Sequence, residues 1–215
     1  MNKAFIFDMD GVIVDTESAW VPHDKQIIET LFEPRVRDQI GSTIGLGIRG
    51  VFEKAHNAGS AITFETLAAA YRDAAREIYN AIQITEGTDH LIDRLATDGF
   101  KIGLVTSSAK EEIDKVLSKL TSRSKFDVLI SLYDEPELRP KPSPDGYIQA
   151  MKVLNADPSR SFVLEDSNYG IASGKAAGCF VIGFRGCLID GYEQIGADAY
   201  ADTMQDVERI VSIRP

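Results

Sequence analysis

The chain has 215 residues, of which 44% are hydrophobic and 26% are charged. This composition is that of a globular protein with one large domain, or one domain and a smaller insert. Its formal net charge of -10 argues against nucleic acid or an anionic membrane as a partner. No apolar run is long enough to span a membrane, and the first residues do not resemble a signal peptide. We therefore expect a cytoplasmic monomer that contacts neither membranes nor nucleic acid.

The first predicted element is a short buried strand at residues 3–7. The region after it, up to residue 82, has no strand candidate. It carries three helical patterns, at residues 18–32, 48–57 and 64–82. The last pattern places its apolar residues along one stripe, as in a helix that packs against others. The simplest arrangement is an all-helical domain of residues 16–82, inserted into a core of residues 1–15 and 83–215.

Strand and helix patterns alternate over the rest of the chain. Further buried strands are predicted at residues 101–106, 126–130, 161–165 and 179–184. Helices are predicted before and between them, at residues 88–98, 109–120, 144–154 and 168–177. This alternation predicts an α/β fold with a doubly wound, Rossmann-like parallel sheet. In such a sheet, ligands bind beyond the carboxyl ends of the strands.

Polar residues gather at the carboxyl ends of the predicted strands. They are Asp8 and Asp10 after the first strand, Thr106 and Ser107 after the second, Lys141 in a loop past the third, and Glu165 and Asp166 after the fourth. Because the carboxyl ends of parallel strands meet at one edge of the sheet, we expect these residues to converge on one crevice. That crevice is the predicted active site.

The residue types in this set indicate phosphoryl transfer. Several carboxylates around a single lysine repel one another at low dielectric, so they need a cation. Oxygen ligands without His or Cys favour Mg²⁺. Once Mg²⁺ and Lys141 neutralise a phosphoryl group, the Asp8 carboxylate is placed to attack phosphorus in line. Asp10 alternates in direction from Asp8 and is a candidate general acid, then base.

The order of these motifs resembles the haloacid dehalogenase superfamily, specifically its β-phosphoglucomutase-like and phosphoglycolate-phosphatase-like members with a helical cap. The resemblance runs from residue 3 to about residue 184. It rests on Asp8-Met9-Asp10-Gly11-Val12, on Thr106, on Lys141-Pro142-Ser143-Pro144-Asp145, and on Glu165-Asp166-Ser167 with Gly170. By this resemblance, residues 16–82 are a cap that closes on the substrate.

The resemblance also implies a role for each site residue. Asp8 is implied as the nucleophile and Asp10 as the acid and base. The implied ligands of Mg²⁺ are Asp8, the backbone carbonyl of Asp10, Asp166 and, directly or through water, Glu165. The implied phosphate-binding groups are the Thr106 and Lys141 side chains and the backbone amides of Met9, Asp10 and Ser107. The segment 41–49 resembles the substrate-contacting loop of related caps. It makes Arg49 a candidate substrate contact, with a flexible helix connection as the alternative.

The expected function is hydrolysis of a small phosphate monoester, such as a sugar phosphate or a phosphoglycolate-like acid, through a phosphoaspartate intermediate. A hexose-phosphate mutase is the first alternative. However, the β-phosphoglucomutases carry a histidine in the first cap helix where this chain has Trp20. A non-catalytic binding protein on the same fold is the second alternative. Such a protein is expected to lose at least one of the central acidic or basic residues, and none is lost.

Overall fold

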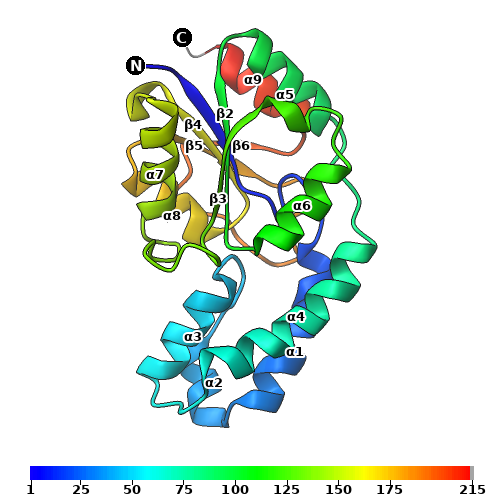
Figure 1. The fold of residues 1–215 in the computed structure, drawn as a ribbon, viewed down its shortest axis with the longest axis vertical. Helices are drawn as coiled ribbons and strands as arrows, with labels where there is room; N and C mark the ends of the chain where they lie inside the picture. The colour runs from blue at the N-terminus through cyan, green and yellow to red at the C-terminus, as the bar shows by residue number, and fades with distance from the viewer. Residues whose placement is uncertain (214–215) are drawn as a thin grey trace.

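The computed structural model describes residues 1–213, so residues 214–215 of the predicted core lie outside the described part of the chain. Its centre is a parallel sheet with the strand order β3-β2-β1-β4-β5-β6 (Figure 1). The strands are β1 (Ala4–Phe7), β2 (Lys101–Thr106), β3 (Phe126–Ser131), β4 (Phe162–Glu165), β5 (Phe180–Phe184) and β6 (Ala199–Ala201). The predicted doubly wound α/β fold is confirmed, and β6 is an addition that the sequence patterns did not indicate.

Helices cover both faces of the sheet. One face carries α5 (Thr88–Thr97), α6 (Lys110–Ser118) and α9 (Met204–Ser212), and the other carries α7 (Asp145–Leu154) and α8 (Asn168–Ala176). The short 3₁₀ helices η1 (Arg123–Lys125) and η2 (Pro158–Arg160) precede β3 and β4. In β1, Phe5 and Phe7 pack against the first group of helices, whereas Ala4 and Ile6 pack against the second. This alternation explains why the strand is apolar at every position.

The helical insertion between β1 and β2 forms a cap. It consists of α1 (Glu17–Leu31), α2 (Pro34–Ile40), α3 (Gly47–Asn57) and α4 (Phe64–Asn80), and it lies beyond one end of the sheet (Figure 1). The cap has a hydrophobic cluster of its own, which includes Ile40, Val51, Leu67 and Tyr71. The short helix α2, which begins with Pro34, was not predicted. The boundaries at residues 15/16 and 82/83 remain a prediction.

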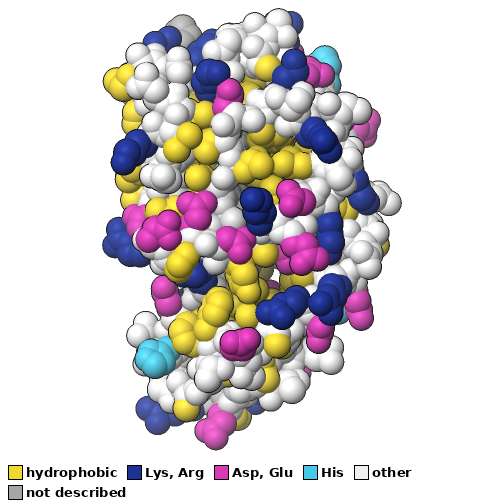
Figure 2. All heavy atoms as spheres, viewed as in Figure 1, with side chains coloured by type: hydrophobic (Ala, Val, Ile, Leu, Met, Phe, Trp, Pro, Cys, Tyr) yellow, Lys and Arg dark blue, Asp and Glu magenta, His cyan; other side chains and the backbone are white. Residues whose placement is uncertain are grey.

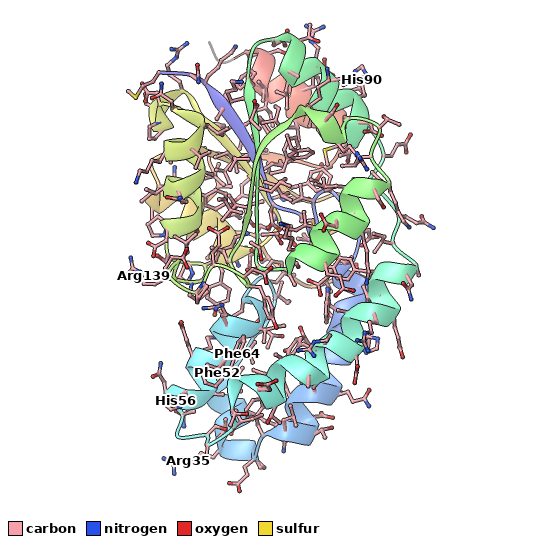
Figure 3. All side chains as sticks on the ribbon, in the orientation of Figure 1. Arg35, Phe52, His56, Phe64, His90 and Arg139 are labelled. Carbon is pink, nitrogen blue, oxygen red and sulfur yellow. The ribbon has the colours of Figure 1, made fainter. Side chains whose placement is uncertain are left out.

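The two chain segments that join cap and core run side by side. Val14 and Ile84 form an isolated antiparallel bridge, and the amide of Thr85 donates to the carbonyl of Ile13 at 2.9 Å. The α3 end of the cap also reaches the core: Arg49 Nε donates to the carbonyl of Tyr133, and the Phe64 ring lies 5.9 Å from the Tyr133 ring. Phe64 contacts the ring of Phe52 within the cap (Figure 3).

The loop before α3 packs directly on the core. Gly45 and Gly47 both have positive φ, at 70° and 67°, and each faces a serine of the core. A Cβ atom added at Gly45 would lie 2.1 Å from Ser167 Cβ, and one added at Gly47 would lie 2.5 Å from Ser107 Cβ. Such distances are far below van der Waals contact, so glycine is needed for the cap to approach this closely. The structure is therefore that of a cap closed on its core.

On the face seen in Figure 2, charged side chains of both signs are spread widely and gather around the middle of the molecule. Among the described residues, no helix is both long and apolar enough to cross a membrane.

Candidate active site

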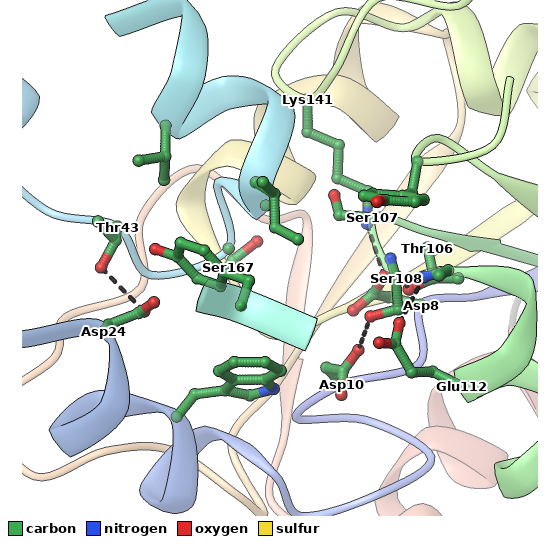
Figure 4. A pocket seen from close by; sticks show the side chains of 18 of the residues that line it. Asp8, Asp10, Asp24, Thr43, Thr106, Ser107, Ser108, Glu112, Lys141 and Ser167 are labelled. Atoms are coloured by element: carbon green, nitrogen blue, oxygen red, sulfur yellow. Dashed lines mark hydrogen bonds and ion pairs between the residues drawn. The ribbon is translucent and has the colours of Figure 1, made fainter. Parts of the chain in front are cut away.

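The polar residues at the strand ends meet between core and cap, where they line a pocket of about 340 Å³ (Figure 4). This volume is in the range of small-molecule sites. Six predicted site residues line it: Asp8, Asp10, Thr106, Ser107, Lys141 and Asp166. The cap supplies residues for the opposite wall, among them Trp20, Asp24, Thr43, Tyr71 and Arg72. Three predicted site residues do not line the pocket: Met9, Arg49 and Glu165.

Lys141 is a buried cation that joins two carboxylates. Its side chain is 3% exposed, and Nζ lies 2.6 Å from Asp8 Oδ1 and 2.6 Å from Glu165 Oε1. Burial by itself lowers the pKa of Lys141, but the charges of Asp8 and Glu165 outweigh it and raise that pKa above its ordinary value. Lys141 therefore stays charged at neutral pH.

Glu165, the second carboxylate partner of Lys141, is fully buried. Its Oε1 also accepts a hydrogen bond from the Tyr147 hydroxyl at 2.6 Å, and its Oε2 accepts one from the Ser167 hydroxyl at 3.2 Å. Gly170, on α8, leaves room for this carboxylate, since a Cβ there would lie 1.9 Å from Glu165 Oε1. Both oxygens of Glu165 are thus engaged within the protein.

Three buried carboxylates form a candidate metal centre. Oxygen atoms of Asp8, Glu165 and Asp166 all lie within 4.8 Å of one another. Burial raises the pKa of Asp8 to about 8; Lys141 opposes this rise, and the charge of Glu165 adds to it. One lysine does not balance three clustered carboxylates, and a divalent cation with oxygen ligands fits this donor set. The Asp166 backbone is fixed by Gln194, whose Nε2 donates to the Asp166 carbonyl at 2.5 Å.

The raised pKa of Asp8 predicts that Mg²⁺ binding depends on pH. With the pKa of Asp8 raised to about 8, a proton on its carboxyl competes with Mg²⁺ below that pH. We expect the Mg²⁺ affinity to rise about tenfold per pH unit below that value and to level off above it. Calorimetric titrations in buffers of different ionisation enthalpy would measure the released proton. Asp8→Asn should remove the pH dependence, and a wild-type affinity that does not change with pH would contradict the prediction.

Three hydroxyl groups hold the Asp10 carboxylate. Thr16 Oγ1 and the Tyr79 hydroxyl donate to Oδ1 at 2.6 and 2.5 Å. Ser108 Oγ donates to Oδ2 at 2.6 Å (Figure 4). Tyr79 comes from the cap helix α4, whereas Ser108 comes from the loop after β2. The position of Asp10 therefore depends on both domains. The sequence patterns did not reveal Tyr79, because nothing in a helical stripe distinguishes a core tyrosine from one that binds a carboxylate.

The end of β2 and the loop after it provide further hydroxyl groups to the pocket. Thr106 Oγ1 accepts from the amide of Ser108 at 3.1 Å, so its hydroxyl proton points elsewhere. The Ser107 hydroxyl is buried and has no hydrogen-bond partner among the described residues. An unpaired buried hydroxyl is costly unless a ligand satisfies it. The Met9 side chain lies in the hydrophobic core, so only its backbone is available for the predicted phosphate contact.

Glu112, at the start of α6, is an acidic neighbour of Asp10 that the sequence patterns did not single out. It lines the pocket, and its carboxylate accepts from the amide of Ala109 at 2.5 Å. Burial raises the pKa of Glu112 to about 7; the hydrogen bond from Ala109 opposes this rise, and the charge of Asp10 adds to it. Glu112 therefore adds to the excess of acidic groups that a bound cation would balance.

Arg49 occupies a different place from the one expected. Its guanidinium donates to the Tyr133 carbonyl at 3.1 Å and lies over the Phe64 ring, 5.7 Å from the centroid. In this closed arrangement Arg49 connects cap to core, and its predicted contact with substrate stays a prediction. Arg72, one residue after Tyr71 on α4, is the cap arginine that lines the pocket.

A parallel sheet with an inserted helical cap, and a carboxylate cluster at the first and fourth strand ends, defines a class of capped α/β enzymes. The chain belongs to the haloacid dehalogenase-like hydrolases, whose family model matches residues 5–184. This confirms the family that the sequence motifs resemble.

Two curated relatives match most of the chain. A validoxylamine A 7'-phosphate phosphatase from Streptomyces hygroscopicus subsp. limoneus is 28% identical over 195 residues and covers 85% of each chain. A phosphorylated carbohydrates phosphatase from Thermotoga maritima is 26% identical over 204 residues and covers 93% of each. Among solved structures, a hydrolase from Pseudomonas syringae has a TM-score of 0.80, with 21% identity and full coverage of both chains. The CbbY structure from Rhodobacter sphaeroides with phosphate has a TM-score of 0.71, with 21% identity and 96% coverage of both.

Proposed function

We propose that the protein is a magnesium-dependent phosphatase that hydrolyses a small phosphate monoester through a phosphoaspartate on Asp8. The observation that carries this proposal is the pairing of a buried Asp8 carboxylate with Lys141 at 2.6 Å, in the pocket that also holds Asp10. The names of the two curated relatives support it: one is a phosphatase of validoxylamine A 7'-phosphate and the other of phosphorylated carbohydrates.

The residues of the pocket suit a two-step reaction. An Asp8 oxygen attacks phosphorus, the bond from phosphorus to the ester oxygen breaks, and Asp10 gives a proton to that oxygen. Water then gives a proton to Asp10 and attacks the phosphoaspartate, which releases inorganic phosphate and restores both side chains. Lys141, Thr106 and Ser107 bind the phosphoryl oxygens throughout.

Mg²⁺, held by the Asp8 and Asp166 carboxylates and the Asp10 carbonyl, would neutralise the negative charge of the phosphoryl group. Glu165 is the fourth predicted ligand, directly or through water. Because Lys141, Tyr147 and Ser167 engage both oxygens of Glu165, we favour the water-mediated role.

One observation favours hydrolysis over phosphoryl transfer between sugar positions. Trp20 lines the pocket at the position where the resembling mutases carry a histidine. Its indole N–H is a donor that cannot accept a proton, so it cannot replace a histidine base. The retained Asp8, Asp10, Lys141 and Asp166 argue against a non-catalytic binding protein.

The proposal is tested by assaying the purified protein with Mg²⁺ against sugar phosphates, nucleotides, phosphoglycolate and p-nitrophenyl phosphate. We expect phosphate release that requires Mg²⁺ and that Ca²⁺ inhibits, because the larger ion takes more oxygen ligands and would engage both Asp8 oxygens. Asp8→Asn is the control. Full activity in excess chelator would contradict the metal requirement, and conversion of glucose 1-phosphate to glucose 6-phosphate without phosphate release would favour the mutase.

A further inference from the structure

The cap wall of the pocket holds a carboxylate that the proposed chemistry does not use. Asp24, on α1, lines the pocket opposite the strand ends, beside Thr43 (Figure 4). Tyr71 also lines this wall and interacts with Asp24. The Thr43 hydroxyl donates to Asp24 Oδ2 at 3.1 Å. Within the described residues, no lysine or arginine forms an ion pair with Asp24. A carboxylate in the wall of a binding pocket, without a lysine or arginine partner, is a site for hydrogen-bond donors of a ligand.

Burial and unsatisfied hydrogen bonding both point to such a ligand. Burial raises the pKa of Asp24, and the nearby hydroxyls of Tyr71 and Thr43 oppose the rise. The Tyr71 hydroxyl is itself buried, on a residue that is 5% exposed, and it does not reach hydrogen-bond geometry with any described group. Asp24 therefore has spare acceptor capacity, and the Tyr71 hydroxyl, which interacts with Asp24 as a donor, still has an acceptor lone pair for a ligand.

An aromatic surface lies next to these polar groups. The Trp20 ring is 6.0 Å from the Tyr71 ring and 6.4 Å from the Tyr79 ring, and Trp20 lines the same pocket. An aromatic face is electron-rich and apolar, so it suits the C–H face of a sugar ring or polyol chain. Hydroxyl groups along the edge of that ligand would then meet Asp24, Thr43 and Tyr71.

Two cationic residues of the pocket would instead favour a substrate with a second anionic group. Arg72 and Lys110 also line it and would attract a second anionic group on the substrate. Both side chains are exposed, so solvent and salt screen their charge. Asp24 is more buried than either, and its charge would repel a second carboxylate or phosphate with less screening. The balance favours a leaving group that is neutral and rich in hydroxyls.

We propose that Asp24, with Thr43 and Tyr71, binds hydroxyl groups of the leaving group, so that the substrate is the monophosphate ester of a neutral sugar or polyol. The site selects against esters that carry a second anionic group, such as phosphoglycolate. This inference rests on the proposed function, because the phosphoryl group must sit on Asp8 for its ester partner to reach the cap wall.

The test compares Asp24→Ala and Asp24→Asn with the wild type, and Asp38→Ala serves as the matched control. Asp38 is an exposed aspartate of the same cap, on α2, that does not line the pocket. The substrates are glucose 6-phosphate, ribose 5-phosphate and glycerol 1-phosphate, with phosphoglycolate as the anionic ester. p-Nitrophenyl phosphate is the ester that lacks aliphatic hydroxyls. Circular dichroism establishes that each variant is folded.

We expect wild-type kcat/KM for the best polyol phosphate to exceed that for phosphoglycolate by at least about tenfold. Asp24→Ala should lower the polyol phosphate value about 10- to 100-fold, and its effect on p-nitrophenyl phosphate should be smaller by about tenfold or more. Asp24→Asn keeps an acceptor but loses the charge. It should retain part of the polyol phosphate rate and raise the phosphoglycolate rate. Asp38→Ala should leave the ratios of kcat/KM between these esters as in the wild type.

The inference is overturned if phosphoglycolate is the best wild-type substrate, or if Asp24→Ala lowers all esters equally. Failure of the proposed function looks different: no ester, including p-nitrophenyl phosphate, is turned over and no phosphoenzyme forms. In that case calorimetry with the same polyol phosphates tests whether Asp24 binds them, independently of turnover. Asp8→Asn should bind at least one of them about tenfold more tightly than Asp8→Asn/Asp24→Ala, and equal affinities would overturn the inference.

Discussion

A burst of p-nitrophenol followed by slow turnover is expected when the Asp10→Asn variant is mixed with p-nitrophenyl phosphate and Mg²⁺. This leaving group needs no proton, so Asp8 still attacks phosphorus. Asparagine cannot accept a proton from water, so the phosphoenzyme accumulates. The hydroxyls of Thr16, Tyr79 and Ser108 remain in place around residue 10, which limits the change to proton transfer. With a sugar phosphate, whose leaving oxygen needs a proton, the rate should fall by about 10² to 10⁴.

The Asp8→Asn variant is the matched comparison. It removes the attacking carboxylate, so neither substrate should give a burst and no phosphoenzyme should be found by mass spectrometry after an acid quench. Stopped-flow absorbance measures the burst, and phosphate release measures the steady state. If both variants lost equal activity on both substrates, without a burst from either, the roles of Asp8 and Asp10 would have to be abandoned.

The core of the fold could be predicted because most of its strands are dominated by buried apolar residues, although Asp127 interrupts β3. β2 begins and ends at the predicted residues, Lys101 and Thr106, since a strand buried on both faces leaves no polar position inside it. The edge strand β6 has three residues, two of them partly exposed, and so gives no comparable signal. The short helix α2 lacks the length that makes a period visible.

The acidic residues of the site could be predicted for a related reason. Asp8 and Glu165 each stand at the end of a buried strand, where an acidic residue needs an explanation. Asp24 and Tyr79 gave no such signal, because a polar residue on a helix is ordinarily exposed and a tyrosine in an apolar stripe is ordinarily core. The contact of Tyr79 with Asp10 joins residues 69 positions apart and exists only because the cap docks on the core.

Docking of the cap also links phosphate binding to proton transfer in the proposed mechanism. Gly47 brings the cap loop against Ser107, a predicted phosphate-binding residue, and α4 brings Tyr79 to Asp10. A cap that moved away would release both contacts together. We therefore expect Asp10 to be held in this position only while the cap is closed, when bulk water is excluded from the pocket.

The Lys141→Met variant is expected to lose both stability and activity. Lys141 is 3% exposed and is the cation bonded to Asp8 and Glu165, so its removal leaves two buried carboxylates without a counter-charge. Breaking a buried pair from one side costs about 3–5 kcal/mol of unfolding free energy. The loss of a cation at the phosphoryl group should lower kcat by about 10² to 10³. Urea denaturation without metal measures the first effect, and phosphate release with Mg²⁺ measures the second.

Lys101→Met is the matched control for stability. Lys101 pairs with Asp127 at 2.8 Å, but the lysine side chain is 46% exposed, so the same substitution there should cost less than about 1 kcal/mol. Mg²⁺ should restore part of the stability of Lys141→Met, because it binds the carboxylates that the lysine has left. Adding Glu165→Gln should also restore part of it in metal-free protein, since one buried charge is removed while the hydroxyl of Tyr147 keeps an acceptor. Two outcomes would show that the buried cation does not hold these carboxylates together. One is an equal loss of unfolding free energy in the two lysine variants, and the other is no recovery of stability in the double variant.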